Sequence, residues 1–343
     1  MSVLPRARKG LMALTLVLLL TGAHGPAAQR PPAGGGTRGP GLGAPAGGGS
    51  NYFTYQVDAD CEREPYGVVN SYDKAPGLIQ RQLDQMRQAG QKRLRIPVYH
   101  HRGQDSGTVM DSTGGRLDAS NVRNLTALLA AVKSAGFEAV EVGFFPQDAN
   151  DPTQWTAFDH GLYEENWKVV RQVRSIVVRS GLAYTLDLLN EGAPPAGKEV
   201  WLRYDKRLWE DYRRTFGTGD TVGFSMTVWI AGRVPQMPEI YGTTPPSVLE
   251  IHLYGQEGGN GSEYEQFMAA DAALDKIGYE QPLIVGEAYY DDAEAAEGIR
   301  RAVVDAQRPV RHLTQWPVLR GGKCPAADVA PPAAYDAYAA AGF

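Results

Sequence analysis

Residues 248–288, VLEIHLYGQEGGNGSEYEQFMAADAALDKIGYEQPLIVGEA, hold two predicted strands, 248–254 and 283–288, separated by a predicted helix at 264–277. The first strand alternates: its odd-numbered positions from 249 are apolar, and its even-numbered positions are Glu250, His252 and Tyr254. Two strands joined through a helix run parallel, because the crossover returns the chain to the edge where it started. This stretch therefore predicts a parallel sheet with polar residues on one face.

The same alternation of strand and helix recurs along the rest of the chain. Further strands are predicted at 52–57, 94–99, 139–145, 183–189, 221–229 and 312–318. Further helices are predicted at 77–89, 121–135, 164–180, 199–216 and 293–306, and residues 235–246 form a connection with little helix. Eight strands in this order favour a single (β/α)8 TIM barrel, since no Gly-x-Gly-x-x-Gly follows the first strand to indicate a doubly wound nucleotide-binding sheet.

The composition of the 343 residues narrows the function. There are 39 acidic and 34 basic residues, a net charge of −5, which argues against a non-specific nucleic-acid binder. Two cysteines exclude a disulfide-dense scaffold and disfavour a multi-cysteine zinc site. We expect no cofactor and a monomer.

The first fifty residues differ from the rest. Residues 1–28 combine Arg6, Arg8 and Lys9 with an apolar run at 11–20 and small residues, the pattern of a signal peptide, with a membrane anchor as the alternative. In 31–50, 13 of the 20 residues are Gly or Pro, so 29–50 is predicted to be a disordered linker. The barrel is expected over 51–325, with a tail at 326–343. These features predict a secreted or periplasmic protein that leaves the membrane after cleavage.

Export would place the chain in an oxidising compartment. Cys61 follows the first predicted strand and Cys324 the last, and these strands are neighbours in a closed barrel. The two cysteines are therefore a candidate disulfide, and two unrelated thiols are the alternative.

Polar residues fall into two groups along the strands. Arg95, Glu141, Asp187 and Glu250 lie within strands, where burial requires that charges pair, so we expect them to form an interior network. A second group lies at the C-terminal ends of the strands, where barrel active sites are found. It comprises Glu191, His252, Tyr254, Glu287 and Trp316.

Together these motifs resemble glycoside hydrolase clan A, and most closely its cellulase-type family 5 branch. The motifs are Arg95-Ile-Pro-Val, Asn190-Glu191, His252-x-Tyr254, Gly286-Glu287 and Trp316. The chain departs from that branch at two points. Gly192 follows Glu191 where the family often has proline, and the third strand ends without a histidine.

The resemblance implies a retaining hydrolase acting on a poly- or oligosaccharide, with Glu191 as general acid/base and Glu287 as nucleophile. Arg95 and Tyr254 would hold Glu287 ionised, and Glu191 would keep its proton. Asn190 would bind a sugar hydroxyl, with a strand-end turn residue as the alternative, and His252 would either bind a hydroxyl or orient a glutamate. Arg95 and Tyr254 would also contact the substrate, and Trp316 would form the floor of a sugar subsite. Less specific candidates for subsite walls are Trp229, Tyr99, His100, His101, Phe145 and Tyr289.

Other classes remain open beside this interpretation. A catalytically inactive carbohydrate-binding barrel would keep the aromatic residues but need not keep both glutamates. A metal-dependent hydrolase is disfavoured because the first strand has no His-x-His. A serine hydrolase is disfavoured because Gly223-Phe-Ser-Met-Thr lacks the second glycine of a nucleophile elbow.

Overall fold

The structure is a computed structural model that describes residues 45, 47–55, 67–227, 229–256, 259–321 and 333–343. Residues 42–343 form one compact unit, and the fold is that of this unit. The predicted signal peptide, most of the predicted linker and the candidate disulfide partners Cys61 and Cys324 lie outside the described residues.

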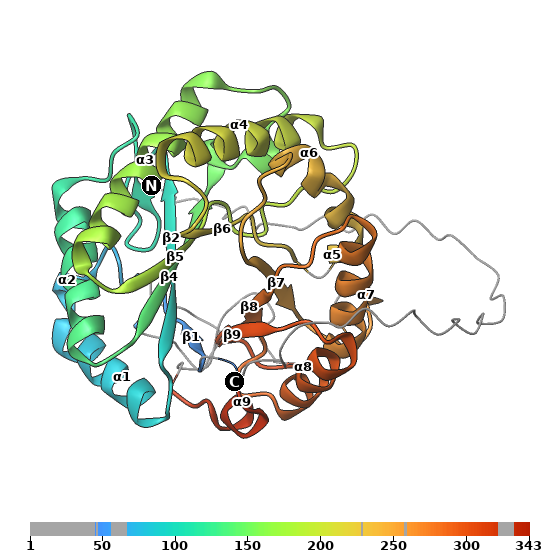
Figure 1. Cartoon of the computed structure of the whole chain (residues 1–343). Helices are drawn as coiled ribbons and strands as arrows, with labels where there is room; N and C mark the ends of the chain where they lie inside the picture. The colour runs from blue at the N-terminus through green and yellow to red at the C-terminus, as the bar shows by residue number, and fades with distance from the viewer. Residues whose placement is uncertain (1–44, 46, 56–66, 228, 257–258, 322–332) are drawn as a thin grey trace, which may run out of the picture. The chain divides into compact units, whose positions relative to one another are not determined.

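The predicted (β/α)8 barrel is confirmed, as Figure 1 shows in a view down its axis. Parallel neighbours follow the order β6-β5-β4-β2-β1-β9-β8-β7, and a two-residue strand β3 (Met110–Asp111) pairs with the end of β2. The ring strands are β1 (Gly49–Asn51), β2 (Arg93–His101), β4 (Ala139–Pro146), β5 (Ala183–Asp187), β6 (Thr221–Gly223), β7 (Leu249–Leu253), β8 (Leu283–Ala288) and β9 (Val310–Gln315).

The ring closes between β6 and β7 through a single residue. Met226 forms a parallel bridge with Ile251. Its N–H donates to the carbonyl of Glu250 at 3.1 Å, and its carbonyl accepts from the N–H of His252 at 2.7 Å. The predicted strand at 221–229 is therefore interrupted: it ends at Gly223, whose φ of +76° bends the chain, and resumes only at Met226.

Helices surround the strands (Figure 1). The long ones are α1 (Pro76–Gln88), α2 (Ala119–Ser134), α3 (His160–Ser180), α4 (Glu199–Phe216), α7 (Glu263–Lys276) and α8 (Ala293–Ala306). Shorter ones are α5 (Ile230–Arg233), α6 (Met237–Tyr241) and α9 (Asp336–Ala341), with 3-10 turns η1 (Tyr72–Lys74), η2 (Asp148–Asn150), η3 (Pro152–Gln154) and η4 (Val234–Gln236).

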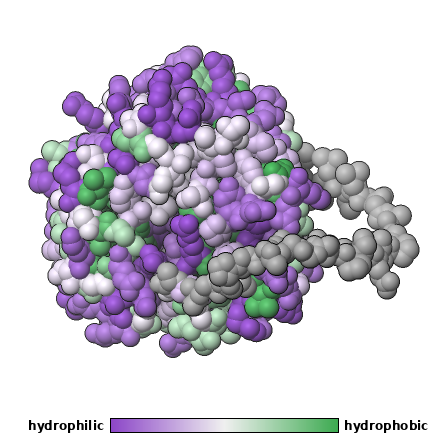
Figure 2. All heavy atoms as spheres, in the orientation of Figure 1, coloured by the Kyte–Doolittle hydropathy of each residue, from purple (hydrophilic) through white to green (hydrophobic). Residues whose placement is uncertain are grey.

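Side-chain caps explain several helix starts. Asp118, Asp159 and Asp292 each accept a hydrogen bond from a backbone N–H of the first turn, and Ser262 forms a capping box with Glu265. No described helix is long and apolar enough to cross a bilayer. In the view of Figure 2 most of the surface is hydrophilic, with hydrophobic residues in small separate patches.

The first strand lies three residues earlier than predicted. Gly49–Asn51 is buried in the sheet, so the fold begins inside the segment predicted to be a linker, and 52–57 is not the first strand. A Cβ on Gly48 would lie 2.0 Å from the carbonyl oxygen of Leu313, and one on Gly49 would lie 1.9 Å from that of Arg93. These glycines serve close packing of backbones, which composition alone could not distinguish from flexibility.

The end of the chain also belongs to the fold. Tyr335, Tyr338 and Phe343, within the predicted tail, are buried in the hydrophobic core around α9. The Tyr335 hydroxyl donates to the carbonyl of Leu313 at 3.0 Å, which ties the tail to β9. The compact unit therefore extends past the predicted boundary at 325.

Candidate active site

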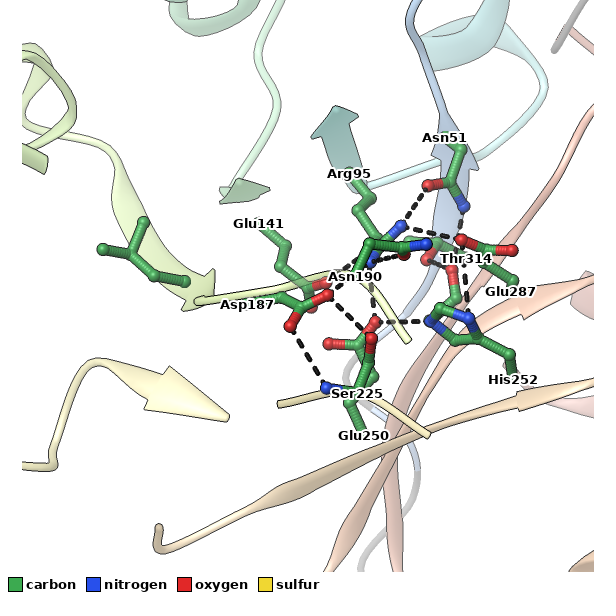
Figure 3. A network of polar contacts seen from close by, with 12 residues as sticks. Asn51, Arg95, Glu141, Asp187, Asn190, Ser225, Glu250, His252, Glu287 and Thr314 are labelled. Atoms are coloured by element: carbon green, nitrogen blue, oxygen red, sulfur yellow. Dashed lines mark hydrogen bonds and ion pairs between the residues drawn. The ribbon is translucent and has the colours of Figure 1, made fainter. Parts of the chain in front are cut away.

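Arg95 is the centre of the polar barrel interior. Its guanidinium is fully buried and pairs with carboxylates of four other strands. Nε lies 2.6 Å from Glu141 and 3.1 Å from Glu250, and Nη2 lies 2.7 Å from Asp187. Figure 3 shows these side chains converging from separate strands. The predicted interior network is thus present, with one arginine satisfying three acids.

The network holds more acid than base. With Glu191 and Glu287 there are five carboxyl groups around three basic side chains, Arg95, His252 and His312. Burial favours the neutral form of a carboxyl and raises the pKa of Asp187 and Glu250. Burial opposes ionisation of Glu141 too, but His312, 3.9 Å away, and the charge of Arg95 lower its pKa to about 2. Protons must therefore be shared among these acids.

Glu287, near the end of β8, is held at both carboxylate oxygens. Oε1 accepts from Arg95 Nη1 at 3.0 Å, and Oε2 accepts from the Tyr254 hydroxyl at 2.9 Å. The preceding position, Gly286, has no room for a side chain, because a Cβ there would lie 1.8 Å from Oε1 of Glu250. The Gly-Glu motif thus lets the nucleophile candidate sit against the charged network.

Glu191 lies just past β5 and is fixed by its backbone. Its φ of +51° is in the left-handed region, which is rare for a residue with a side chain. Its N–H donates to Ser225 Oγ at 2.7 Å, and its carbonyl accepts from Arg233 Nη1 at 3.0 Å. Ser225 Oγ in turn donates to Asp187 at 2.8 Å. These bonds hold a strained conformation that aims the carboxylate, 36% exposed, into the mouth of the barrel.

Asn190 lies beside Glu191 and joins the same network. Its Oδ1 accepts from Arg95 Nη2 at 2.8 Å. With the carbonyl oxygen engaged, the amide N–H groups are the part of Asn190 that can donate to a ligand.

His252 on β7 is fully buried among three carboxylates. Nε2 lies 3.1 Å from Glu250, while Nδ1 lies 3.3 Å from Glu191 and 3.5 Å from Glu287. Burial disfavours the imidazolium, but the charge of Glu287 and the hydrogen bonds to Glu191 and Glu250 outweigh it and raise the pKa of His252 to about 10. His252 therefore holds a proton at neutral pH.

The two glutamates face each other across this histidine. One ligand atom from each of Glu191, His252 and Glu287 lies within 4.8 Å of the other two. The pKa directions are the reverse of those expected. Burial raises the pKa of Glu287 despite the charges of His252 and Arg95, whereas the hydrogen bond and charge of His252 overcome burial and lower the pKa of Glu191. The expectation was wrong because it gave too little weight to the burial of Glu287 and left out the proton on His252, which favours ionisation of Glu191.

Aromatic rings form one wall of the site. Trp316, after β9, stacks on Phe53 with ring centroids 4.8 Å apart and an interplanar angle of 23°, and it packs against the Tyr254–Tyr289 pair. Phe145 lies 6.2 Å from Trp316 and 4.7 Å from Tyr99.

Other predicted wall residues are not part of this arrangement. Trp229 is 54% exposed at the start of α5, and no described hydrogen bond or ring contact joins its side chain to the glutamates. His100 is buried against Ser112, and His101 pairs with Asp148.

A hollow of about 370 Å³ opens beside Glu191. Its lining includes Asn190 and Glu191 but not Glu287, and it continues over Phe145 toward Trp201 and Arg233. It therefore extends from the site on the Glu191 side.

The trio Glu191, His252 and Glu287 has the donor types of a metal site. The surroundings disfavour a cation there. Arg95 Nη1 already lies 3.0 Å from Glu287 Oε1, and His252 itself carries positive charge at neutral pH. A metal would have to displace both, so the donors fit a metal poorly.

Several residues that shape the site were not predicted. They are Asn51, which accepts from Arg95 at 3.1 Å, together with Phe53, Ser225 and Arg233. Ser225 and Arg233 follow the interrupted strand β6, in a segment whose sequence shows no strand or helix periodicity. Asn51 was missed because the first strand was predicted at 52–57. With the strand at Gly49–Asn51, the side chain of Asn51 belongs to the barrel interior.

The chain was compared with known proteins. No protein-family model and no curated sequence matches it. Solved structures do: a GH5_18 protein of Streptomyces cattleya in complex with Manβ1-4GlcNAc is 14% identical with a TM-score of 0.56, over 87% of this chain and 79% of that one. A GH5_18 protein of Bifidobacterium longum is 15% identical with a TM-score of 0.55, over 82% and 72%.

A third similar structure is the exo-β-1,4-mannosidase of Opitutaceae bacterium strain TAV5, 16% identical with a TM-score of 0.52. The match covers 81% of this chain and 54% of that one, so the chain spans about half the length of that mannosidase. At such identities the likeness shows a shared barrel fold, and the chemistry has to be argued from the site.

Proposed function

We propose that the protein is a retaining glycoside hydrolase. The observation that carries the proposal is the approach of Glu191 and Glu287 to within 4.8 Å at the mouth of the barrel. Retaining enzymes place their two carboxyl groups about 5–5.5 Å apart, while inverting enzymes need about 6.5–9.5 Å to admit a water. The separation supports direct attack by one carboxylate. The GH5 proteins of similar fold support a glycoside hydrolase.

The first step forms a glycosyl-enzyme ester. A Glu287 oxygen attacks the anomeric carbon, and the bond from that carbon to the leaving oxygen breaks with its electron pair on the oxygen. Glu191 gives its proton to this oxygen, so the leaving group departs as an alcohol. Arg95 and Tyr254 orient the Glu287 carboxylate for the attack.

The second step reverses these roles. The Glu191 carboxylate takes a proton from water, the water oxygen attacks the anomeric carbon, and the carboxylate of Glu287 is released. Both substitutions invert the carbon, so the net configuration is retained.

Glu191 needs a proton for the first step, and His252 is its source. In the free enzyme the proton resides on His252, whose Nδ1 lies 3.3 Å from Glu191 Oε1. Transfer along this contact leaves neutral His252 and protonated Glu191. It is unfavourable in the free enzyme, where the pKa of Glu191 is lowered, and a bound sugar that covers the partly exposed carboxyl favours it by removing water. His252 is thus a positioning and proton-holding residue buried beneath the reacting groups.

We further propose that the substrate is a poly- or oligosaccharide and that the protein is exported. The stacked Trp316 and Phe53 offer an apolar face suited to a sugar ring, and the amide of Asn190 offers donors to a hydroxyl. Export rests on the pattern of residues 1–28.

Two glutamate variants test the mechanism. Glu287→Gln should lower turnover of aryl glycosides by at least about 10³-fold, since it removes the nucleophile. Glu191→Ala should retain activity only on activated aryl glycosides, and azide should restore part of it by forming a glycosyl azide with the configuration of the substrate. The exposed Glu280→Gln is the matched control and should behave as the parent.

Product NMR supplies the stereochemical check. An inverted product, or full activity of Glu287→Gln, would refute the mechanism. Sugar binding without turnover in the parent would instead point to a non-catalytic carbohydrate-binding barrel.

A further inference from the structure

The hollow beside Glu191 has a defined place in the proposed reaction. A general acid protonates the leaving oxygen, so the departing residue must lie against Glu191. The hollow is lined by Glu191 but not by Glu287, and its volume of about 370 Å³ falls in the range of small-molecule pockets, about 300–1,000 Å³. It is therefore the space for the leaving group.

Two cations line this hollow, Arg233 and Lys198. Arg233 is only 9% exposed, and its Nε has no hydrogen-bond partner. Nη1 bonds to backbone carbonyls of Glu191 and Ala193, and none of the described carboxylates lies within ion-pair distance of the guanidinium. The charge of Arg233 is thus neutralised only weakly by its surroundings.

Three acids have to be weighed against these cations. Asp205, near Arg233, is fully buried, and burial raises its pKa well above the usual range, which favours the neutral acid. Asp151 lines the hollow, accepts the N–H of Thr153 at 2.9 Å and has a pKa raised by burial. Glu191 also lines the hollow, and it is neutral only after it has received the proton of His252. In that acid-ready form Arg233 and Lys198 face the single carboxylate of Asp151, so the hollow carries a net positive charge.

Lys198 occupies a position where its charge is unfavourable for folding. It is the N-cap of α4, an exposed site with no side-chain capping bond, and it places a cation at the positive end of an 18-residue helix. Ser, Thr, Asp or Asn would stabilise the helix more. The helix end, Lys198 and Arg233 add their positive potentials on the same side of Glu191.

We propose that this hollow is a leaving-group subsite for an anionic sugar residue, one carrying a carboxylate or a sulfate. The neutral walls suit a sugar: Gln147 and Gln154 offer amides, and Trp201 offers a ring beneath the Arg233 guanidinium, 5.5 Å away. The assignment as a leaving-group subsite rests on the proposed glycosidase function. The anion preference rests on the charges alone.

Binding tests the charge preference without requiring turnover. Affinities for glucuronate, glucose 6-sulfate and glucose are measured by NMR titration at low salt in a Glu191→Gln parent, whose residue 191 is neutral as in the acid-ready form. We expect the anionic sugar to bind about fivefold more tightly than glucose, the range of a solvent-exposed charge pair. Binding of glucuronate alone would identify a uronic acid, and binding of glucose 6-sulfate alone would identify a sulfated sugar.

Variants of Lys198 test whether this residue causes the preference for anionic sugars. Lys198→Gln should bring the anionic-to-neutral affinity ratio close to one, while Lys198→Arg, which keeps the charge, should preserve it. Lys276→Gln, an exposed lysine at the end of α7, is the matched control and should match the parent. Added salt should reduce the ratio in the parent.

The outcomes separate the two proposals. No anionic preference in the parent, or an unchanged ratio in Lys198→Gln, overturns the subsite even if neutral glycosides are hydrolysed. An anionic preference that depends on Lys198 in a protein without glycosidase activity supports the anion site and refutes the proposed reaction. On a hydrolysed glycone, kcat/KM for an anionic leaving residue should exceed that for its neutral counterpart by a similar factor.

Discussion

Replacing His252 by glutamine removes a proton that the folded state binds more tightly than the unfolded chain does. His252 is fully buried with carboxylates at 3.1, 3.3 and 3.5 Å. Glutamine keeps a hydrogen-bonding side chain of similar reach but cannot be protonated. The variant therefore isolates the charge on the imidazolium from its hydrogen bonds.

The size and sign follow from the pKa of His252, raised from the usual 6.5 to about 10. A group that binds its proton more tightly in the folded state stabilises that state fully below its unfolded pKa, and the effect is lost as pH rises through the folded pKa. At 1.36 kcal/mol for each pH unit between 6.5 and 10, the upper limit is about 5 kcal/mol. Parent and variant should thus differ most near pH 6 and least near pH 10.

Urea unfolding at intervals from pH 6 to 9.5 measures this difference. The free energy of unfolding of the parent should fall toward that of His252→Gln as pH rises. His160→Gln, at an exposed histidine at the start of α3, is the matched control for the substitution. A parent-to-variant gap that is constant, or that widens with pH, would show that His252 is not held as an imidazolium.

Two further predictions concern the support of the site and the end of the chain. Ser225→Ala should lower the free energy of unfolding by about 1–3 kcal/mol, because a buried N–H of Glu191 and an oxygen of Asp187 each lose a partner. Its kcat should fall more for poor leaving groups than for good ones, and an equal fall for both would argue against a role in placing the acid. Deleting residues 333–343 removes the buried Tyr335 and Tyr338, each worth roughly 3–5 kcal/mol, so thermal unfolding of the shortened chain should begin at a much lower temperature. An unchanged melting curve would contradict the docking of α9.

The barrel could be predicted because its strands carry their own signal. The strand at 139–145 is found at Ala139–Pro146, and that at 283–288 is found as predicted, since both are apolar runs bounded by turn residues. The first strand could not be placed, because Gly48 and Gly49 are selected for backbone contacts with Leu313 and Arg93 that only the closed ring creates. Local composition carries no trace of those contacts.

In the site, too, some features could be predicted from the sequence and others could not. Residue parity and strand ends predicted that Glu191, His252 and Glu287 would meet, and the structure brings them together. The location of the proton was not predictable, since it depends on distances across the barrel from His252 to acids on other strands. Arg233 and Ser225 were missed because they lie beyond Gly223, where the chain leaves regular structure.

The proton on His252 links stability to the proposed chemistry. Five carboxyl groups share the barrel interior with Arg95, His252 and His312, so each proton that leaves on the alkaline side adds an uncompensated buried charge. The same proton is the one that Glu191 must receive before it can act as an acid. Loss of this proton at high pH therefore weakens the fold and removes the acid together, so the alkaline limit of activity should lie near the pH at which unfolding becomes easier. In His252→Gln the two limits should separate, because Glu191 must then draw its proton from solvent while the stability no longer changes with the imidazole.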